Sequence, residues 1–308
     1  MTDQRAAAVV GGGNMGADIA AILAAHGWRV TVVEPGRDRW PALRERIAHS
    51  AKQLGNPAID FEVVAASANV RWGGVGLAIE CAPENLDLKR AIFAELERLA
   101  PADAILASNS SSFPISEIAA GLATRSRMLG LHFFLPAHLV PAVEVIRGEA
   151  TDDAVWRRAA ELMRDCGKVP VMVKKDIPGF LANRIQHALM REAFALIDAG
   201  LATPEDIDNA VRYGFGFRYV AAGPILQKDF AGLDIHLAAG TTMYPDLADN
   251  KAPSPTLAKL VAEGKLGVKT GEGFWKWTSE SAAAARERYE RDLAEALEIL
   301  KRSLAPRR

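Results

Sequence analysis

Cysteine, net charge and long apolar runs are all scarce in this sequence. Its 308 residues include two cysteines, Cys81 and Cys166, without metal-ligand spacing, so we expect reduced thiols and no metal site. The formal net charge is −1 and no basic patch stands out, which argues against nucleic acid as a partner. No uninterrupted apolar stretch reaches membrane-spanning length, and the N-terminal residues lead straight into a strand-like run without room for a signal peptide. These absences predict a cytoplasmic protein that does not associate with membranes.

The first forty residues contain a strand, a glycine-rich turn, a helix and a second strand in the order of a dinucleotide-binding domain. Gly11, Gly13 and Gly16 follow the first apolar run with G-x-G-x-x-G spacing. The first permits a tight turn, the second lets a pyrophosphate approach the backbone, and the third lets the helix pack on the strand. The amides that open the helix, at Asn14 and Met15, are free to bind phosphates. A glycine-rich turn in an ordinary α/β domain is the alternative, and the placement of strand, helix and acid favours the dinucleotide site.

An acidic residue, Glu34, ends the second strand 18 residues after Gly16. Its carboxylate can accept hydrogen bonds from a ribose 2′-hydroxyl and would repel a 2′-phosphate. The sequence therefore predicts NAD rather than NADP as the cofactor. Arg37 and Arg39 follow closely and weaken that preference.

Short apolar runs alternate with helical segments as far as residue 173, which predicts an α/β fold with a doubly wound, mostly parallel sheet of Rossmann type. The segment Asp176–Gly179 ends this alternation, and the rest of the chain is almost entirely helical in its pattern. We therefore expect an NAD-binding Rossmann domain over residues 1–177 and an all-α domain over residues 178–308. Local expectations are helices over 115–122 and 180–199, a helix capped by Thr151, another capped by Thr203, a strand near 68–70 and a loop over 214–224.

A histidine and a glutamate are placed to carry acid–base chemistry. His132 lies late in a predicted strand, and Glu144 follows 12 residues later on the next strand. Oxidation of an alcohol requires removal of the hydroxyl proton as hydride leaves the carbon, and an imidazole suits this step because it titrates near neutrality. A carboxylate partner orients the imidazole and stabilises its cation. A structural histidine is the alternative, and the residues alone leave the two interpretations about equal.

Polar side chains gather at the end of the predicted strand over residues 104–107. Asn109 and the serines beside it could reach a substrate or a nicotinamide ring, and one of them could instead cap the next helix. Asn183 lies in the first turns of a predicted apolar helix, where it is either a buried structural amide or a substrate ligand. The residues leave both alternatives open.

Several ordered motifs extend along nearly the whole chain: VVGGGNMGADIA, IECAPENLDLK, ASNSSSFPISEIA, GLHFF, VEVI, DIPGFLANR and KTGEGFWKW. Together they resemble the 3-hydroxyacyl-CoA dehydrogenase family, and their order and spacing make the resemblance highly specific. It implies an NAD-dependent enzyme whose helical second domain completes the substrate cleft and forms a homodimer. The ExxxENLxxK stretch of the family lines the nicotinamide side, which implies this place for Glu84 and Lys89.

The resemblance also implies roles for four candidate catalytic residues. The histidine of the family's HFF motif is the general acid/base, which corresponds to His132, and the glutamate of the VEV segment orients it, which corresponds to Glu144. The serine of SNxSS and the asparagine of PGFxxNR contact the reacting oxygen or the substrate, which implies these contacts for Ser111 and Asn183.

Three departures separate the chain from family members that use acyl-CoA. Leu135 stands where the family motif HFFNP has asparagine, which removes a polar group beside the site. About 35 residues separate Glu34 from the predicted strand near 68–70, so much of the lysine-bearing hairpin that helps hold CoA is missing. The segment GFGFRYVAAGP replaces a shorter GYPMGP-like turn and contains Arg218.

The longer segment resembles the branch of the family that acts on free acids: L-gulonate 3-dehydrogenase with lambda-crystallin, carnitine dehydrogenase and a pyridine-carboxylate dehydrogenase. The last also shares the P-x-H-x-x-P pattern of Pro136, His138 and Pro141. This resemblance implies that Arg218 binds a substrate carboxylate with both ends of its guanidinium. A solvated loop arginine is the alternative.

We therefore expect an NAD-dependent dehydrogenase that oxidises a small free 3-hydroxy carboxylic acid to its keto form. An L-3-hydroxyacyl-CoA such as 3-hydroxybutyryl-CoA, in fatty-acid metabolism, is the second candidate substrate. Lambda-crystallin, a structural lens protein on this scaffold, supplies a non-enzymatic alternative. The presence of His132, Glu144 and Asn183 favours an enzyme.

Overall fold

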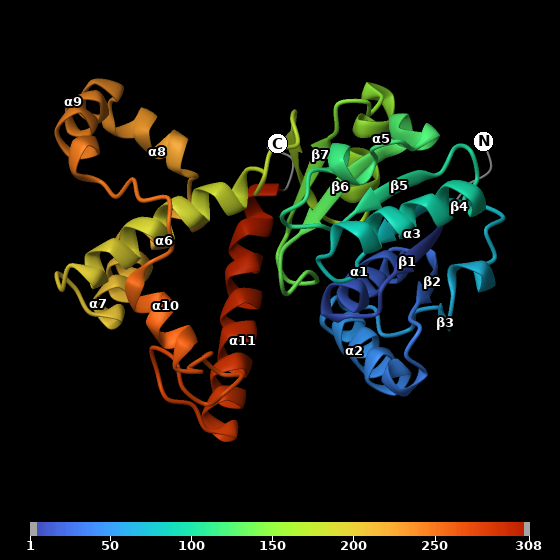
Figure 1. Cartoon of the computed structure of the whole chain (residues 1–308), viewed down its shortest axis with the longest axis horizontal. Coiled ribbons are helices and arrows are strands. Elements are labelled where there is room, and N and C mark those ends of the chain that lie inside the picture. The colour runs from blue at the N-terminus through green and yellow to red at the C-terminus, as the bar shows by residue number, and fades with distance from the viewer. Residues whose placement is uncertain (1–4, 305–308) are drawn as a thin grey trace. The chain divides into compact units, whose positions relative to one another are not determined.

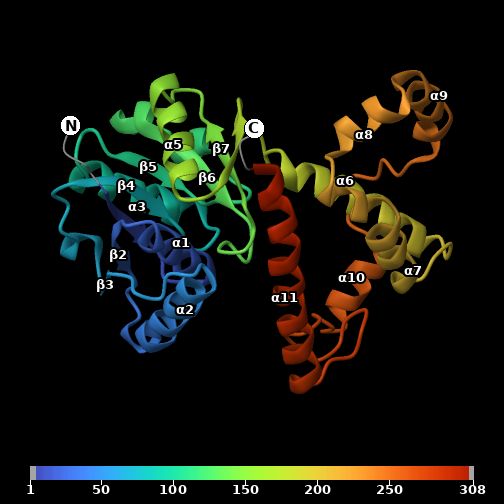
Figure 2. The same cartoon turned by 180° about the vertical axis from the view of Figure 1, so that it is seen from behind.

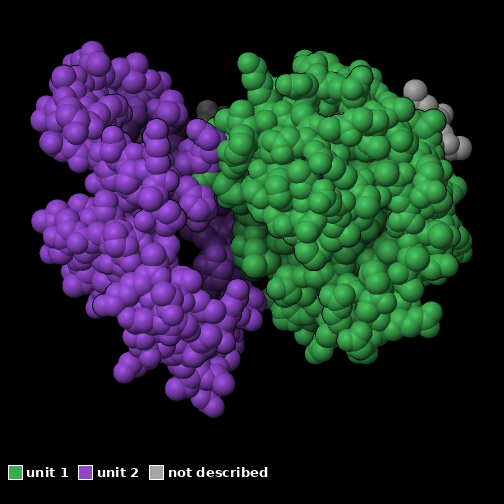
Figure 3. Space-filling model, viewed as in Figure 1, with its two compact units in different colours: residues 1–183 green, residues 184–308 purple. Residues whose placement is uncertain are grey.

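The computed structural model describes residues 5–304, and the chain divides into two compact units over residues 1–183 and 184–308 (Figure 3). The first unit contains a sheet with helices, and the second is mainly helical (Figure 1). Within the described part of the chain, no helix combines the length and apolar character needed to cross a membrane. The expected α/β fold followed by an all-α region is confirmed.

The first unit is built on one eight-stranded sheet in the order β3-β2-β1-β4-β5-β6-β7-β8. β6 and β7 pair antiparallel, whereas the other neighbouring strands pair parallel. The order from β3 to β6 is that of a doubly wound dinucleotide-binding fold, whose ligand lies beyond the carboxyl ends of the strands where the order reverses, here between β1 and β4. The strands are β1 (Ala6–Val10), β2 (Arg29–Val33), β3 (Phe61–Val64), β4 (Val75–Glu80), β5 (Ile105–Ser108), β6 (Met128–Phe133), β7 (Ala142–Arg147) and β8 (Val169–Val173).

Helices cover both faces of this sheet, as the two opposite views show (Figure 1, Figure 2). The side chains of β1 alternate between the faces, with Ala7 and Val9 in one apolar cluster and Ala8 and Val10 in the other. Burial of a large aliphatic side chain contributes about 1.5–3 kcal/mol, so packing on both faces holds β1 in the centre of the sheet. The first cluster includes helices α1 (Asn14–Ala25), α2 (Trp40–Gln53) and α5 (Asp153–Asp165), and the second includes α3 (Leu86–Leu99) and α4 (Ile115–Ile118).

The connection after β2 differs from the expectation in one element. The strand expected near residues 68–70 lies instead at β3, whose aromatic and β-branched residues favour extended backbone, and residues 67–69 form a 3₁₀ turn. Residues 34–60 therefore contain only a 3₁₀ turn, η1 (Arg37–Arg39), and α2. This connection includes no helical hairpin.

Two further expectations in the first unit are wrong. α4 ends at Ile118 rather than at residue 122, and the chain turns soon afterwards at Gly121, whose φ is 82°. Thr151 does not cap α5, because its hydroxyl is used in a turn: it donates to the Met128 carbonyl and accepts the N–H of Gly148. The residue at the cap position of α5 is Asp152.

The second unit begins within α6 (Ala182–Asp198), which starts two residues later than expected because Phe180 adopts a left-handed φ of 49°. Thr203 and Asp206 form a capping box at the start of α7 (Pro204–Asn209), as expected. The loop expected over residues 214–224 is wrong, because Gly216 takes helical backbone angles and the chain continues through a π-helical and a 3₁₀ turn. The remaining elements are η4 (Ala210–Phe215), η5 (Gly216–Val220), α8 (Pro224–Ala231), α9 (Leu233–Met243), η6 (Tyr244–Asp246), α10 (Pro255–Ala262) and α11 (Ser279–Leu304).

Candidate active site

A cavity of about 740 Å³ lies at the carboxyl ends of β1, β2, β3 and β4, where the strand order reverses. This is the place at which a doubly wound sheet binds its ligand. Its walls come from the glycine-rich turn, the start of α1, the segments that follow the other strands and one side of α3. Lining residues include Gly11, Gly13, Asn14, Met15, Glu34 and Leu135.

Two glycines of the motif are required by close contacts, and the third leaves open space. Gly11 has a φ of 112°, and a methyl group there would lie 2.6 Å from the carbonyl oxygen of Cys81. A methyl group at Gly16 would lie 1.9 Å from the carbonyl oxygen of Gly11, so only glycine lets α1 approach the turn. At Gly13 nothing lies within 4 Å of that position, and no side chain among the described residues caps α1. The free amides and the open space fit the pyrophosphate of a dinucleotide.

Glu34 follows β2 and lines the same cavity, with 3% of its surface exposed. Its Oε2 accepts the N–H of Gly12 at 3.2 Å, and its Oε1 accepts the N–H of Gly36 at 2.8 Å. Two backbone amides therefore fix the orientation of this carboxylate. It lies at the end of β2, where the ribose-binding acid of such folds is found.

His132 and Glu144 lie directly opposite each other in the antiparallel pairing of β6 with β7. Nδ1 of His132 is 2.7 Å from Oε2 of Glu144, and both side chains are buried. The rings of Phe134 and Phe180 flank the imidazole, with centroids 4.8 Å and 5.6 Å away. Because Nδ1 meets the carboxylate, Nε2 is the nitrogen left to exchange a proton with a ligand.

Glu144 also connects the histidine to the start of α6. Its Oε1 accepts the backbone N–H groups of Leu181 and Ala182 at 3.0 Å and 2.8 Å. Burial raises the pKa of Glu144, but the hydrogen bonds with His132, Ala182 and Leu181 outweigh it, so the pKa is lowered below its ordinary value. A carboxylate that stays charged in this position can stabilise a protonated imidazole.

A network of two acids and one lysine, in which Glu80 and Lys89 are buried and Glu84 is exposed, holds the serine-rich segment after β5. Lys89 on α3 is 1% exposed, and its Nζ lies 2.9 Å from Oε1 of Glu80 and 3.2 Å from Oε2 of Glu84. The hydroxyls of Ser110 and Ser112 donate to Oε1 of Glu84 at 2.6 Å and 2.5 Å. Burial would raise the pKa of Glu84, but these hydrogen bonds and the charge of Lys89 lower it to about 2.

Glu80 is a member of this network that we did not expect among the site residues. It is fully buried, and its Oε2 accepts the hydroxyl of Ser108 at 2.6 Å. A lone acid at the end of the apolar strand β4 was the available signal, because such a charge needs a buried partner. Glu84 and Lys89 are not among the described residues that line the 740 Å³ cavity: Glu84 binds the loop after β5, and Lys89 binds Glu84.

One hydroxyl of the serine run differs from the others in its hydrogen bonding. The hydroxyl of Ser111 has no hydrogen-bond partner within the described residues, whereas its backbone carbonyl accepts Nδ2 of Asn183 at 3.4 Å. Oδ1 of Asn109 accepts the N–H of Phe133 at 2.9 Å, which joins the end of β5 to the residue after His132. The structure thus brings Ser111 and Asn183 together at the start of α6, beside the amides that bind Glu144.

The histidine of the P-x-H-x-x-P pattern lies in a different, buried cluster. The carboxylate of Asp18 on α1 accepts hydrogen bonds from Nε and Nη2 of Arg46, each at 3.0 Å. It also accepts one from the backbone N–H of Ala137 at 3.1 Å. Nδ1 of His138 lies 3.3 Å from Oδ2 of the same aspartate. Burial would raise the pKa of Asp18, but its contacts with His138 and Arg46 lower it. His138 therefore anchors the segment after β6.

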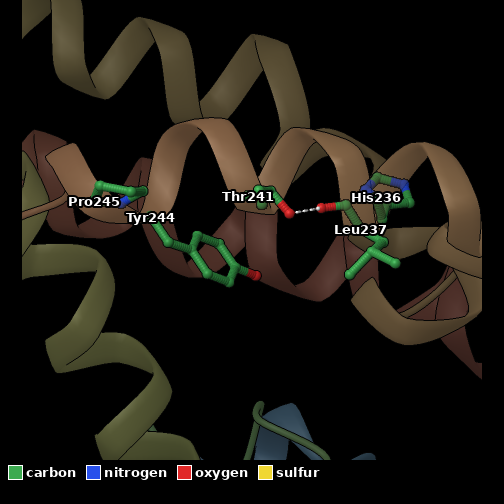
Figure 4. Close-up of a pocket in the computed structure, with 6 residues that line it drawn as sticks. His236, Leu237, Thr241, Tyr244 and Pro245 are labelled. Carbon is green, nitrogen blue, oxygen red and sulfur yellow. Dashed lines mark hydrogen bonds between the residues drawn. The ribbon is translucent and has the colours of Figure 1, made fainter.

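The remaining candidate, Arg218, belongs to the second unit, where it lies on η5 with its side chain exposed. A separate cavity of about 510 Å³ lies in that unit along α9 and η6. Figure 4 shows its lining residues, together with a hydrogen bond from Oγ1 of Thr241 to the Leu237 carbonyl at 2.8 Å. This lining contains no acid paired with a base, and the described residues include no cluster of three metal-ligating side chains. We therefore place the candidate active site in the first unit.

Comparison with known protein families gives matches along most of the chain. The NAD binding domain of 3-hydroxyacyl-CoA dehydrogenase matches residues 6–177, and the C-terminal domain of 3-hydroxyacyl-CoA dehydrogenase matches residues 179–277. The chain is 34% identical over 305 residues to a 5-formyl-3-hydroxy-2-methylpyridine 4-carboxylate 5-dehydrogenase of Mesorhizobium japonicum, which covers 95% of this chain and 97% of the relative. It is 34% identical over 286 residues to the human mitochondrial hydroxyacyl-coenzyme A dehydrogenase, covering 87% of this chain and 90% of that protein.

Solved structures show the same two kinds of relative. A 5-formyl-3-hydroxy-2-methylpyridine 4-carboxylic acid 5-dehydrogenase, described as an NAD⁺-dependent dismutase, has a TM-score of 0.91 at 32% identity and covers 96% of this chain and 98% of its own. The (S)-3-hydroxybutyryl-CoA dehydrogenase of Ralstonia eutropha has a TM-score of 0.72 at 32% identity and covers 89% and 99%. The chain therefore belongs to the 3-hydroxyacyl-CoA dehydrogenase family and is an NAD-dependent dehydrogenase that acts on a hydroxyl group.

Proposed function

We propose that the chain oxidises the hydroxyl group of a small free 3-hydroxy carboxylic acid to the keto form. The observation that carries this chemistry is the buried His132–Glu144 pair, with 2.7 Å between Nδ1 and Oε2. β6 runs parallel to β1 through β5, so His132, near the carboxyl end of β6, lies on the same side of the sheet as the carboxyl ends that hold the dinucleotide cavity.

The cofactor is assigned to the 740 Å³ cavity. Gly13 leaves space for the pyrophosphate, Gly11 and Gly16 let the turn and α1 pack closely, and the amides of Asn14 and Met15 bind the phosphates. The carboxylate of Glu34 then accepts hydrogen bonds from the hydroxyls of the adenosine ribose. NAD, when bound, supplies the acceptor for the hydride.

The nicotinamide side is assigned to the loops after β4 and β5. Glu84 binds the serine run, Lys89 pairs with Glu84, and Asn109 joins that run to β6. Their part in cofactor binding is therefore to shape the loop that meets the ring. Ser111 is the member of this loop whose hydroxyl is left to contact a ligand.

The proton is handled by residues of the first unit. Nε2 of His132 takes the proton of the substrate hydroxyl, and the carboxylate of Glu144 stabilises the imidazolium that results. Ser111 and Asn183 orient the reacting oxygen through their side chains. Phe134 and Phe180 flank the imidazole, which limits access of water to it.

A free acid is favoured over a CoA thioester by the short connection after β2. That connection contains only η1 and α2, so a lysine-bearing hairpin that would hold CoA is missing. The pyridine-carboxylate relative also covers 96% of this chain, compared with 89% for the 3-hydroxybutyryl-CoA enzyme. The resemblance to the free-acid branch supports Arg218 as the partner of the substrate carboxylate, since its guanidinium is exposed and can bind both oxygens.

A substrate panel with an arginine variant tests this proposal. Free 3-hydroxy acids and hydroxylated ring carboxylates, their methyl esters and their CoA thioesters are compared by formation of NADH. Arg218→Met should lower kcat/KM for the free acid, with a loss of transition-state stabilisation of about 2–4 kcal/mol. The value of kcat/KM for the neutral ester should stay nearly unchanged. Arg212→Met is the matched control, because Arg212 is also exposed on the preceding turn and lies over the ring of Tyr213.

An L-3-hydroxyacyl-CoA is the second candidate substrate, because relatives such as the human mitochondrial enzyme are named for it. A thioester turned over far better than every free acid, with Arg218→Met harmless to that reaction, would establish this candidate and reject the first.

We also propose a domain boundary at residues 177/178 and a homodimer formed by the second domain. Cys81 and Cys166 are both free thiols, which supports a reducing, cytoplasmic location.

A further inference from the structure

The acid at the ribose end of the dinucleotide cavity is paired with an arginine. Nη2 of Arg39 lies 2.7 Å from Oε1 of Glu34, and the side chains are 65% and 4% exposed respectively. Arg39 is itself among the residues that line the cavity. A carboxylate that would repel a 2′-phosphate is therefore accompanied by a cation at the same edge.

The backbone after β2 leaves room for this cation. A methyl group at Gly36 would lie 2.7 Å from Nε and 3.1 Å from Nη2 of Arg39, so a side chain there would displace the guanidinium. The N–H of Gly36 donates to the same Oε1 of Glu34 that Arg39 contacts. A guanidinium has five N–H donors, which is more than one carboxylate can use, so donors remain for an anion in the cavity.

Arg37, the other arginine after β2, is used differently. Its guanidinium lies over the ring of Trp40, 5.5 Å from the centroid, and it is not among the described residues that line the cavity. Nε1 of Trp40 in turn donates to the Glu34 carbonyl at 2.8 Å. Of the two arginines, only Arg39 is therefore placed to meet a cofactor.

We propose that Arg39 sets the choice between NAD and NADP, and that it lets the chain bind NADP as well as NAD. It offsets the charge of Glu34 and presents a fork of donors that matches the geometry of a 2′-phosphate. An acid at this position favours NAD and a nearby arginine accommodates the 2′-phosphate, and here the two lie in contact. This inference rests on the proposed placement of the adenosine ribose beside Glu34.

Direct titration with NADH and NADPH, followed by nicotinamide fluorescence, tests the proposal on the full chain. The measured quantity is the ratio of the Kd for NADPH to the Kd for NADH. Arg39→Gln should raise this ratio by about 10- to 100-fold, because the phosphate loses a charge-assisted pair and faces an unpaired Glu34. Glu34→Gln should lower the ratio, because the repulsion is removed and the guanidinium is kept.

Arg37→Gln is the matched control, because it removes the same charge two residues away and should change the ratio by less than about 3-fold. A wild-type chain that binds NADH but no NADPH would overturn the proposal. So would an unchanged ratio in Arg39→Gln, or an equal rise in Arg37→Gln. The titration needs no substrate, so a chain that binds NADH and oxidises no acid would reject the proposed reaction while still deciding the role of Arg39.

Discussion

His132 and Glu144 are 12 residues apart in the chain and directly opposite in the sheet, so the register of one strand pair sets the distance between them. A slip of one residue would send Glu144 to the other face of the sheet. The amides of Leu181 and Ala182 oppose such a slip, because they bind the second oxygen of the same carboxylate. The geometry of the His132–Glu144 pair thus depends on contacts from β6, β7 and the start of α6.

The first prediction concerns the histidine. His132→Gln should lower kcat by about 10²- to 10⁴-fold, because no group would remain to take the hydroxyl proton, while NADH binding is retained. The pKa of Glu144 is lowered, so its carboxylate stays charged as the pH falls, and protonation of Glu144 should not limit activity near neutral pH. Steady-state kinetics across pH and NADH titration provide the measurements.

His138→Gln is the control for this prediction. His138 is buried beside Asp18, so its replacement should lower Tm and leave kcat of the folded enzyme nearly unchanged. Near-normal turnover in His132→Gln, or a loss of kcat confined to His138→Gln, would remove His132 as the base.

The places of residues within one local motif were predictable from sequence, whereas the buried contacts of Lys89 were not. Gly11, Gly16 and Glu34 belong to one local motif whose spacing already implies their places. Lys89 was expected near the nicotinamide, but its burial between Glu80 and Glu84 depends on how α3 packs on the sheet. Such pairings join separate elements, so no local pattern encodes them.

At the scale of elements, the segment after β6 is held by charges that do not touch the catalytic pair. Asp18 binds Arg46 on α2 and the N–H of Ala137, and Nζ of Lys168 donates to the carbonyls of Ala137 and Val140 at 2.6 Å and 3.0 Å. Burial lowers the pKa of Lys168 to about 8. These contacts fasten α1, α2 and the start of β8 to the loop that follows His132.

The second prediction tests this anchor. Asp18→Asn should reduce the free energy of unfolding by about 3–5 kcal/mol, because it removes a buried carboxylate and leaves Arg46 without its counter-charge. The native pKa of Asp18 is lowered, so its stabilising effect is present at neutral pH and is lost as the pH falls below about 4. Wild-type and variant chains should therefore converge in stability at acid pH.

Urea unfolding at fixed chain concentration provides the measurement, with Asp153→Asn as the control. Asp153 pairs with Arg157 and Arg147 at the surface, so its replacement should change the midpoint little. Equal midpoints for wild type and Asp18→Asn at neutral pH would show that the cluster does not stabilise the fold.

Element boundaries were predictable where a cap or stop residue defines them and not where backbone torsion does. Thr203 marked the start of α7 correctly, because its hydroxyl and the Asp206 carboxylate satisfy the first amides of the helix. Phe180 delayed the start of α6, because the left-handed angle it adopts is rare for an aromatic residue. The glycines at 214 and 216 suggested a loop, yet glycine permits helical angles as readily as turn angles.

At the scale of the whole molecule, the two units differ in how much apolar surface they bury. The first unit contains two large apolar clusters, whereas Ala193 is the only buried apolar side chain among the described residues of the second unit. Large apolar side chains of α8 and α9 are strongly exposed, including Ile225 at 79% and Leu237 at 74%. Exposed apolar surface of this kind is typical of interfaces, and from the family resemblance we expect a second copy to cover it.

The last prediction is that the chain forms a dimer through this surface. Sedimentation at micromolar concentration should give about twice the chain mass of 33.1 kDa. Leu237→Asp should weaken the dimer by roughly 30-fold, because burying an unpaired carboxylate at the interface costs about 2 kcal/mol or more. Leu201→Asp is the matched control, because Leu201 is 73% exposed on the turn after α6 and lies outside α8 and α9. A wild-type monomer would reject the dimer, and dissociation by Leu201→Asp alone would move the interface away from α9.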